Sequence, residues 1–417
     1  MLIQLKKNNY ISYLFIFIFF LSITNAQTYT MSIDLGINPS NENLWWIKNN
    51  NFGFKNYPNY QNTKIKINKS DFEFELNMFS NLDELNKVSL NESYIKFFIK
   101  ENTYFKIGRY YRDFSKYLND DLSSGSILIS NNSQAMPKVG IVSKKNLLKN
   151  NKISFDYGIA HAIFDKNDIY SSSPFLHEKF FYLNIKNKNT IFSIGFIHEA
   201  IWGGTIESEH RFSGKQPQSI SDFLKVFISG DGPDDFPHAN ALGNHLGIWD
   251  FSFQRIQGDK NFKAYYQHIF EDTSGLRFDN KTDGLWGIEL KNYIKNTSIL
   301  LEYINTKNQY LDPPYVGEDY YNHGLYRYGW SYKNYTLGNP FISHLNPIAT
   351  DYIYFGLSGL IQDEFHLKLK CFRELSRSSI VNYKVEVMKN FKNDYLIGAV
   401  IFKNKKESFG LKLIKEL

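Results

Sequence analysis

Hydrophobic and polar residues alternate with a period of two along most of the chain, in one short segment after another. Residues 72–78 read FEFELNM, residues 153–159 read ISFDYGI and residues 365–371 read FHLKLKC. Because successive side chains of a strand point to opposite faces, each segment has one apolar and one polar face. The same pattern recurs at residues 286–291 and 409–417, and it predicts a chain made mainly of β-strands.

A soluble β-sandwich would show the same alternation, but the lengths and charges of these segments favour a transmembrane barrel. The polar faces carry full charges, and 417 residues are too many for one two-layer sandwich. The segments are about 8 to 12 residues long, the length of a tilted membrane-spanning strand. A barrel also leaves no unpaired strand edge in lipid. We therefore predict an all-β fold, a transmembrane antiparallel β-barrel of about 16–18 strands.

Aromatic residues near the ends of the segments support the same fold. Outer-membrane barrels carry a girdle of aromatic side chains at each membrane interface. We expect this girdle to include Tyr29, Tyr94, Tyr104, Trp249, Tyr293, Tyr352 and Tyr395.

The first 26 residues have the three parts of a secretory signal. Lys6 and Lys7 precede an apolar run at residues 11–23, and Ala26 ends a small-residue cleavage site. The alternative is a short membrane anchor, but a spanning helix needs about 20 apolar residues. We expect cleavage to remove residues 1–26, and residues 27–417 to form the barrel in the outer membrane of a Gram-negative bacterium.

Three stretches are too long and irregular to be hairpin turns, near residues 112–137, 202–245 and 308–347. Long loops of barrels usually lie outside the cell, although some fold inward as plugs, and such segments are often functional. The second stretch contains one helix signal, because Ser221 or Asp222 could cap an apolar turn that starts at Phe223. Two positions stay open for this helix: a small plug or lid, or a place on the barrel rim.

Composition excludes several other classes of protein. Aromatic residues make up 17% of the chain, while hydrophobic residues make up 42% and the mean hydropathy is −0.40. The aromatic content excludes a disordered chain. No stretch after residue 25 approaches the roughly 18 apolar residues of a spanning helix, which excludes a bundle of membrane helices. The single cysteine, Cys371, excludes a disulfide-stapled domain and lies on an apolar strand face. A net charge of +6 without a basic stripe gives no indication of nucleic-acid binding.

Catalytic and metal-binding patterns are weak. His245 with Ser252 or Ser274 invites comparison with outer-membrane phospholipases, which place a serine, a histidine and an asparagine on the barrel wall, but no nucleophile signature is present. The histidines lack the spacing of metal ligands. Residues 231–235, DGPDD, supply many oxygens but lack the spaced pattern of a calcium loop. We predict a protein that is not an enzyme and has no cofactor and no metal site.

Several loop motifs together resemble those of the capsule-assembly Wzi family of outer-membrane proteins, in its Bacteroidetes-type form. They occur in order between about residues 105 and 345, more than half of the mature chain. The motifs are LSSGS at 122–126, AMPK at 135–138, HEAIWGG at 198–204, DFLKV at 222–226, NALGNHLG at 240–247, YQHIFEDTSG at 266–275, DGLWG at 283–287, DYYN at 319–322 and GNP at 338–340.

The resemblance implies a lectin-like barrel that anchors capsular polysaccharide at the cell surface, without catalysis or a cofactor. The implied partners are capsular or other surface polysaccharide, outer-membrane lipid and the capsule export machinery. The alternative is a general diffusion porin or small-solute channel of the same architecture. An open lumen would indicate a porin, whereas a plugged lumen with aromatic residues on the outer loops would indicate a polysaccharide anchor.

Polysaccharide recognition uses aromatic faces that stack on sugar rings, together with amide, carboxylate and guanidinium groups that bind hydroxyls. The loops supply such residues, although an aromatic can instead belong to the girdle and an Asn or Asp to a turn. Arg109 could instead line the lumen. The candidate binding residues are Trp202, Asn240, Asn244, His245, Asp319, Tyr320, Tyr321, Trp330, Asn339, Arg109 and Arg112.

Overall fold

The computed structural model describes residues 28–37, 59–83, 88–147, 152–207, 209, 212–232, 241–308, 320–391, 395–403 and 407–416. The signal peptide predicted at residues 1–26 lies outside these residues. Among the helices that the structure describes, none has the length and apolar content needed to cross a membrane.

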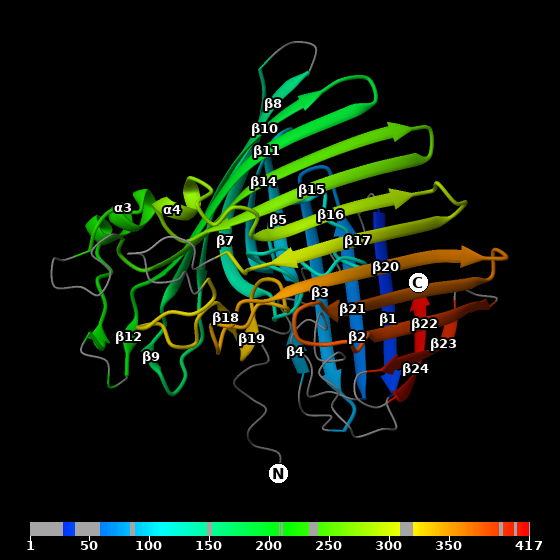
Figure 1. Ribbon diagram of the computed structural model, residues 1–417. Coiled ribbons are helices and arrows are strands. Elements are labelled where there is room, and N and C mark those ends of the chain that lie inside the picture. Colours follow the sequence, from blue (N-terminus) through cyan, green and yellow to red (C-terminus); the bar gives the residue numbers. More distant parts are fainter. Residues whose placement is uncertain are drawn as a thin grey trace.

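The alternating segments form one closed antiparallel barrel (Figure 1). The barrel closes where β1 (Thr28–Ile37) pairs with β2 (Tyr60–Asn68) along one edge and with β24 (Glu407–Glu416) along the other. The sheet contains 19 strands, but β4 and β5 pair in succession with β3 and act as one interrupted strand, which leaves 18. The predicted all-β barrel of 16–18 strands is therefore confirmed.

The remaining barrel strands follow the chain order, with neighbours in sequence pairing in space. They are β3 (Phe72–Asn81), β4 (Val88–Leu90), β5 (Ser93–Lys100), β6 (Thr103–Tyr110), β7 (Met136–Asn146), β8 (Ile153–Ile163), β10 (Phe175–Lys186), β11 (Thr190–Trp202), β14 (Asn244–Gln257), β15 (Lys260–Phe270), β16 (Gly284–Lys291), β17 (Thr297–Asn305), β20 (Asp351–Ile361), β21 (Phe365–Glu374), β22 (Asn382–Phe391) and β23 (Tyr395–Lys403).

The other elements lie in the connections between these strands. A small sheet contains β9 (Tyr170–Ser172), β12 (Thr205–Ile206) and β13 (Gly214–Lys215), and a hairpin contains β18 (Ser331–Tyr332) and β19 (Tyr335–Thr336). The helices in the described part of the chain are α3 (Ile220–Ile228) and α4 (Thr273–Leu276).

The two faces of the strands meet different surroundings. On β3, Glu75 forms an ion pair of 2.7 Å with Lys64 and Glu73 one of 3.2 Å with Lys66, so the charged faces of β2 and β3 line the lumen. On the opposite faces, apolar side chains such as Ile288 and Leu411 are about half exposed. An outward apolar band around a polar interior is the pattern of a barrel in a membrane.

The two ends of the barrel differ in the length of their connections. At one end, tight turns join the strands, such as the turn of residues 187–190 between β10 and β11. At the other end, the connections after β6, β11 and β17 are long. Since outer-membrane barrels have short periplasmic turns and long outer loops, the long connections lie on the outer side.

The predicted aromatic girdle is right for some residues and wrong for others. Tyr29 and Tyr395 lie on the outward faces of β1 and β23 and are partly exposed. Tyr94 and Tyr104 point into the lumen instead, because the hydroxyl of Tyr94 donates to Glu73 at 2.5 Å and that of Tyr104 donates to Asp113 at 2.9 Å. Tyr352 also faces inward, where its ring lies 4.7 Å from that of Phe341. The position of an aromatic residue along its strand determines its height in the membrane. Whether it points outward or into the lumen depends on the alternation of side chains along the strand.

Candidate functional site

The connection between β6 and β7 folds into the lumen, and we call residues 111–135 the plug segment. Its middle is fully covered, since Ser124, Ser126, Ile127 and Leu128 have no exposed surface. The segment is irregular, with turns in place of a helix. It therefore relies on side chains of the barrel wall to bind its backbone and hydroxyl groups.

Asp250 on β14 anchors the first part of the plug segment. Its carboxylate accepts hydrogen bonds from the Ser115 hydroxyl at 2.5 Å, from the Tyr182 hydroxyl at 2.5 Å and from the Tyr117 hydroxyl. The backbone NH of Ser115 donates in turn to the Tyr182 oxygen at 3.0 Å. A fully buried carboxylate is tolerated here because these donors replace water.

Two further wall residues bind the middle of the plug segment. The Gln267 amide oxygen accepts from the Ile127 backbone NH at 2.9 Å and from the Ser126 hydroxyl at 3.2 Å. The Glu302 carboxylate accepts from the Ser124 backbone NH at 2.7 Å and from a tyrosine hydroxyl of β15. Sequence reasoning missed Asp250, Gln267 and Glu302 as positioning residues. One sequence feature could have identified them: each is a polar residue on the polar face of a strand, in a chain that also has a long, irregular, serine-rich loop.

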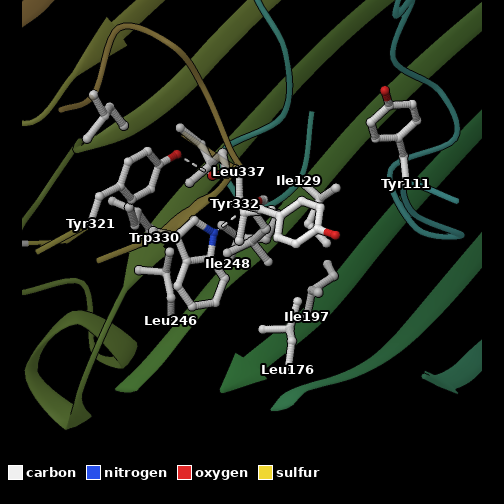
Figure 2. Close-up of a cluster of buried hydrophobic side chains, with 14 of the residues drawn as sticks. Tyr111, Ile129, Leu176, Ile197, Leu246, Ile248, Tyr321, Trp330, Tyr332 and Leu337 are labelled. Carbon is white, nitrogen blue, oxygen red and sulfur yellow. Dashed lines mark hydrogen bonds between the residues drawn. The ribbon is translucent and has the colours of Figure 1, made fainter. Parts of the chain in front are cut away.

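The connection between β17 and β20 covers the plug segment from outside, and we call residues 320–350 the cap segment. The indole NH of Trp330 donates to the Leu128 carbonyl at 2.8 Å, and the Tyr321 hydroxyl donates to the Ile127 carbonyl. Figure 2 shows Trp330 and Leu337 packed among apolar side chains of the barrel wall, including Leu246 of β14. The cap segment thus satisfies backbone carbonyls of the plug segment while burying apolar surface.

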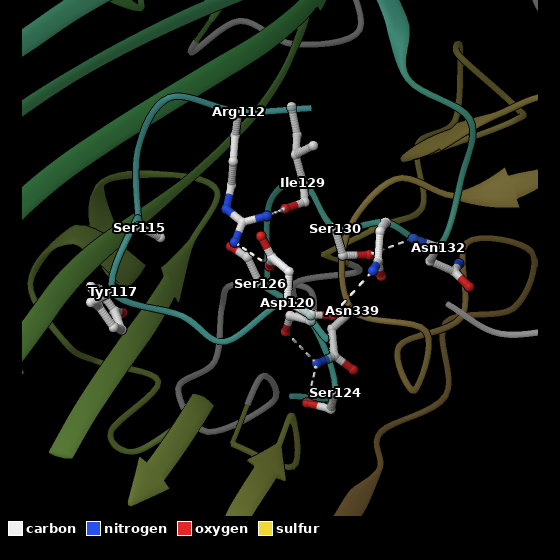
Figure 3. A network of polar contacts seen from close by, with 12 residues as sticks. Arg112, Ser115, Tyr117, Asp120, Ser124, Ser126, Ile129, Ser130, Asn132 and Asn339 are labelled. Atoms are coloured by element: carbon white, nitrogen blue, oxygen red, sulfur yellow. Dashed lines mark hydrogen bonds and ion pairs between the residues drawn. The ribbon is translucent and has the colours of Figure 1, made fainter. Parts of the chain in front are cut away.

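Amide and hydroxyl side chains join the two segments (Figure 3). The Asn339 amide donates to the Ser124 hydroxyl at 3.0 Å and to the Gly125 carbonyl at 2.9 Å. The Asn132 amide donates to the Thr336 carbonyl at 2.9 Å, and the Ser130 hydroxyl donates to the Gly338 carbonyl at 2.6 Å. Through these bonds the plug and cap segments form one closed unit across the lumen.

Gly338 lies at a close approach of the cap segment to the plug segment. A Cβ atom there would lie 1.9 Å from the Ile127 carbonyl oxygen and 2.3 Å from the Tyr321 hydroxyl oxygen. We expect Gly338→Ala to separate the two segments and to destabilise the protein by about 1–3 kcal/mol. Thermal unfolding in detergent checks this, with Gly324→Ala as the control because no atom lies within 4 Å of the position that its added methyl group would occupy. Equal midpoints for the two variants would contradict the close contact.

Charged groups hold the start of the plug segment. Arg112 donates to Asp120 at 2.5 Å and to the Ile129 carbonyl at 3.2 Å (Figure 3). Burial alone would raise the pKa of Asp113, but the ammonium groups of Lys106 and Lys116 outweigh it and hold this pKa below its usual range.

At the start of the cap segment, the Tyr320 hydroxyl donates to Asp283 at 2.7 Å. Burial raises the pKa of Asp283 to about 6. This carboxylate also accepts from the Asn305 and Asn308 amides, at 3.0 and 2.9 Å. The start of the cap segment is therefore tied to the loop that precedes β16.

The outer surface of the cap segment contains a polar groove of about 370 Å³, which we call the cap groove. Its lining combines amide, hydroxyl, phenol and imidazole groups with a few apolar side chains. The residues that line it are Asn132, Asn334, Tyr335, Thr336, Pro340, Phe341, Ile342, Ser343, His344, Leu345 and Tyr352. Such a lining can stack on a sugar ring and bind its hydroxyls.

A second cavity lies on the other side of the plug segment, towards the short turns. Its volume is about 410 Å³, and charged side chains including Lys116, Lys144 and Asp156 line it. Glu101 and Asn102, which form the turn between β5 and β6, also border it. This cavity therefore opens towards the periplasmic end, and we call it the periplasmic cavity.

Most of the predicted binding residues are buried in the described part of the chain. The rings of Trp330, Tyr320 and Tyr321 are covered by protein, and so are the amides of Asn244 and Asn339. The hydrogen bonds of Trp330, Tyr321 and Asn339 join the cap segment to the plug segment, so these residues position the outer loops. Asn240 and Asp319 lie outside the described residues.

Three of the predicted residues occupy other places. Arg109 is partly exposed and donates to the Ala135 carbonyl at 3.0 Å and to the Tyr332 hydroxyl at 3.2 Å. Arg112 is inside the plug segment. Trp202 lies on the outer wall of the barrel under helix α3, with its ring 5.7 Å from that of Phe223. None of the predicted binding residues in the described part of the chain lines the cap groove, although several of them lie in the plug and cap segments that form it.

Helix α3 lies on the outer wall near the rim, which is the second of the two positions predicted for it (Figure 1). The Phe223 ring lies 5.5 Å from His161 of β8 and 5.3 Å from His177 of β10. His177 faces outward, because its neighbour Glu178 faces the lumen and binds Lys138 at 2.8 Å. The helix is capped by Ser219, in a capping box with Asp222, two residues earlier than the predicted Ser221.

The histidine considered for a lipid hydrolase also lies on this outer wall. The ring nitrogens of His245 contact His198 at 2.8 Å and the Leu242 carbonyl at 3.0 Å. Ser252 is two residues from Asp250 on the same strand and therefore faces the lumen. His245 and Ser252 thus lie on opposite faces of the wall, and these two residues cannot form a serine–histidine pair. The side chain of Ser274, the other serine considered, lies outside the described part of the structure.

Comparisons with known proteins agree with the fold. The family model described as capsule assembly protein Wzi matches residues 47–355. The solved structure of Escherichia coli Wzi, described as an outer-membrane protein involved in group 1 capsule assembly and a carbohydrate-binding β-barrel, is 13% identical with a TM-score of 0.60. That match covers 97% of this chain and 87% of the other.

Weaker structural likeness extends to porins. A mutant porin of Rhodopseudomonas blastica is 9% identical with a TM-score of 0.44, and the match covers 94% of this chain and 99% of the porin. Among curated proteins no match is found.

Proposed function

The chain belongs to the Wzi family of capsule assembly proteins, and we propose that it is a lectin-like barrel of the outer membrane that holds capsular polysaccharide at the cell surface. In this proposal the protein is not an enzyme, and it acts by binding. The solved family member with the same fold is described as carbohydrate-binding, which supports the proposal.

The observation that carries the proposal is the closed unit of plug and cap segments across the lumen. A diffusion porin needs a water-filled path along the barrel axis, whereas here Ile127, Leu128 and Trp330 are completely buried at its centre. A polysaccharide that meets this barrel from outside would stay on the loops. The porin alternative is therefore not favoured.

We place the polysaccharide in the cap groove. Asn334 is exposed at the tip of the β18–β19 hairpin, and Tyr335, His344 and Tyr352 present partly exposed rings beside it. The buried candidates Trp330, Tyr321 and Asn339 support the groove from beneath, and Arg109 steadies the hairpin through Tyr332. Export machinery remains a proposed partner, and the periplasmic cavity is the surface that such a partner could reach.

Deleting the gene should leave capsule synthesised but shed into the medium, and the groove variant Asn334→Gly with Tyr335→Ala should do the same in part. Glycine preserves the positive φ of 67° at Asn334 while removing the amide. Losing one stacking ring and one or two hydrogen bonds should weaken binding by about tenfold or more. The measurement is the ratio of cell-bound to released capsule, together with binding of the purified protein to purified capsule.

A matched control is Asn296→Gly, which removes another exposed asparagine of positive φ from a turn at the periplasmic end. It should retain capsule like the native protein. Capsule that stays attached after gene deletion would refute the anchor function. Normal attachment in the groove variant, with release on deletion, would refute only the position of the site.

A further inference from the structure

Helix α3 has three sides that differ in chemistry. Phe223 and Val226 form the side that packs on the barrel wall. Ile220, Leu224 and Ile228 are spaced by four residues and share one flank, where they are 83%, 58% and 74% exposed. Ser221 and Lys225 have the same spacing on the next flank and are also exposed. The helix therefore presents one side to protein, one apolar flank and one polar flank.

The apolar flank is turned towards the membrane. Phe227 lies three residues after Leu224 and seven after Ile220, so it belongs to the same side of the helix. Lys179 places its Nζ 4.4 Å from the centre of the Phe227 ring and also donates to the Phe227 carbonyl. On β10, Lys179 is two residues nearer to the periplasmic turns than His177, which lies under Phe223. The flank that carries Phe227 thus points down the wall, and the polar flank points away from the membrane.

Beside the helix, the outer wall is hollowed into an apolar groove of about 540 Å³, which we call the wall groove. Phe105, Val139, Ile141, His161, Trp202 and Phe223 line it. Val139 and Ile141 are 41% and 40% exposed on the outward faces of β7, next to the equally exposed Ile107 of β6. The wall groove is therefore continuous with the apolar surface that the barrel presents to lipid.

We propose that α3 is an interfacial helix of the outer leaflet and that the wall groove holds an acyl chain of an outer-leaflet lipid. An acyl chain fits because the groove is apolar and opens onto the lipid-facing wall. Lys179 marks the height of the interface, because a lysine on a lipid-facing wall is strongly destabilising at the membrane midplane and nearly neutral near the headgroups. There its ammonium group can also meet anionic headgroups.

This arrangement fixes the long connection between β11 and β14 to the membrane surface. The helix begins 18 residues after the end of β11 and ends 16 residues before β14, as their bounds show. Phe223 and Val226 hold the helix on the wall, but without lipid its apolar flank would remain exposed to water. In the membrane, the flank is buried against lipid, and the resulting stabilisation increases with its apolar surface area.

Spin labels on adjacent residues of α3 test the orientation. In a Cys371→Ser background, which removes the single cysteine, labels are attached at Ile220→Cys and Leu224→Cys, with the adjacent Ser221→Cys and Lys225→Cys as matched controls on the polar flank. In proteoliposomes, the first pair should be accessible to oxygen and protected from a water-soluble nickel complex, and the controls should show the reverse. Equal access to the nickel complex at all four sites would overturn the proposal. Protection from both reagents at Ile220 and Leu224 would also overturn it, since a second protein copy would then cover the flank.

Native mass spectrometry of the intact barrel tests the wall groove. Val139→Trp should fill the groove and lose the bound lipid, whereas Ile107→Trp adds the same ring to the neighbouring wall outside the groove and should retain it. Both variants keep an apolar side chain on an exposed lipid-facing position, so both should fold. Equal lipid retention by the two variants would overturn the groove assignment, as would the absence of retained lipid from the native protein.

Discussion

Removing the plug segment should turn the closed barrel into an ion-conducting channel. Tyr110 and Met136 are direct partners in the β6–β7 ladder, so a two-residue Asn-Gly turn can replace residues 111–135 without changing the strand register. The deletion removes Ile127 and Leu128, and with them the carbonyl groups that Tyr321 and Trp330 bind. The cap segment then loses its support as well.

The size of the barrel explains why the effect should be large. Barrels of 16–18 strands are wide enough for an aqueous channel unless loops fill them. The lumen of this barrel is lined by charged residues such as Glu73, Glu75 and Lys66, which would hold water once the apolar plug is gone. We expect stable single-channel currents in planar bilayers from the deletion variant and little conductance from the native protein.

Asp121→Asn provides the control for this experiment. Asp121 is an exposed residue of the plug segment that forms an ion pair of 2.6 Å with Lys368, and its change leaves the buried part of the plug intact. This variant should remain closed. A deletion variant that folds, as judged by heat-modifiable gel mobility, but carries no current would show that the plug segment is not what closes the lumen.

The barrel was predictable because its signal is repeated and local. The alternation of apolar and polar residues within each strand indicates which side chains face lipid and which face the lumen. A wrong assignment of one strand therefore does not affect the others. The girdle shows the limit of this reasoning, because Tyr94 and Tyr104 occupy the right height but point inward to Glu73 and Asp113. The partners that determine this orientation lie on another strand or on the plug segment.

The proposed binding site was less predictable, because aromatic and amide residues occur in buried and exposed positions equally well. Trp330 and Asn339 have the residue types that sugars favour, yet their polar atoms bind plug carbonyls. The distinction depends on contacts between segments about 200 residues apart in sequence, such as Asn339 with Ser124. No local sequence pattern predicts such a contact. The loops that form it could be recognised in the sequence because they are long and irregular.

Asp250→Ala should loosen the plug segment more than any other single change in the barrel wall. The substitution leaves the hydroxyls of Ser115, Tyr117 and Tyr182 without their shared acceptor. Hydrogen bonds to a charged group contribute about 1.5–3 kcal/mol each, and their effects overlap at one carboxylate, so we expect a loss of about 3–5 kcal/mol. Chemical unfolding in detergent measures this loss.

Protease sensitivity distinguishes a loosened plug from general destabilisation. Lys116 borders the periplasmic cavity between two residues that depend on Asp250, so trypsin should cleave after Lys116 much faster in Asp250→Ala than in the native protein. Ser252→Ala is the matched control, because Ser252 is two residues along the same strand, is buried and lines the same cavity. Asp250→Asn should be intermediate, since its amide keeps one acceptor oxygen and its NH2 can donate to hydroxyl oxygens. If all three variants resist trypsin equally, Asp250 does not hold the plug, and the lumen must be closed chiefly by the contacts of Gln267, Glu302 and the cap segment.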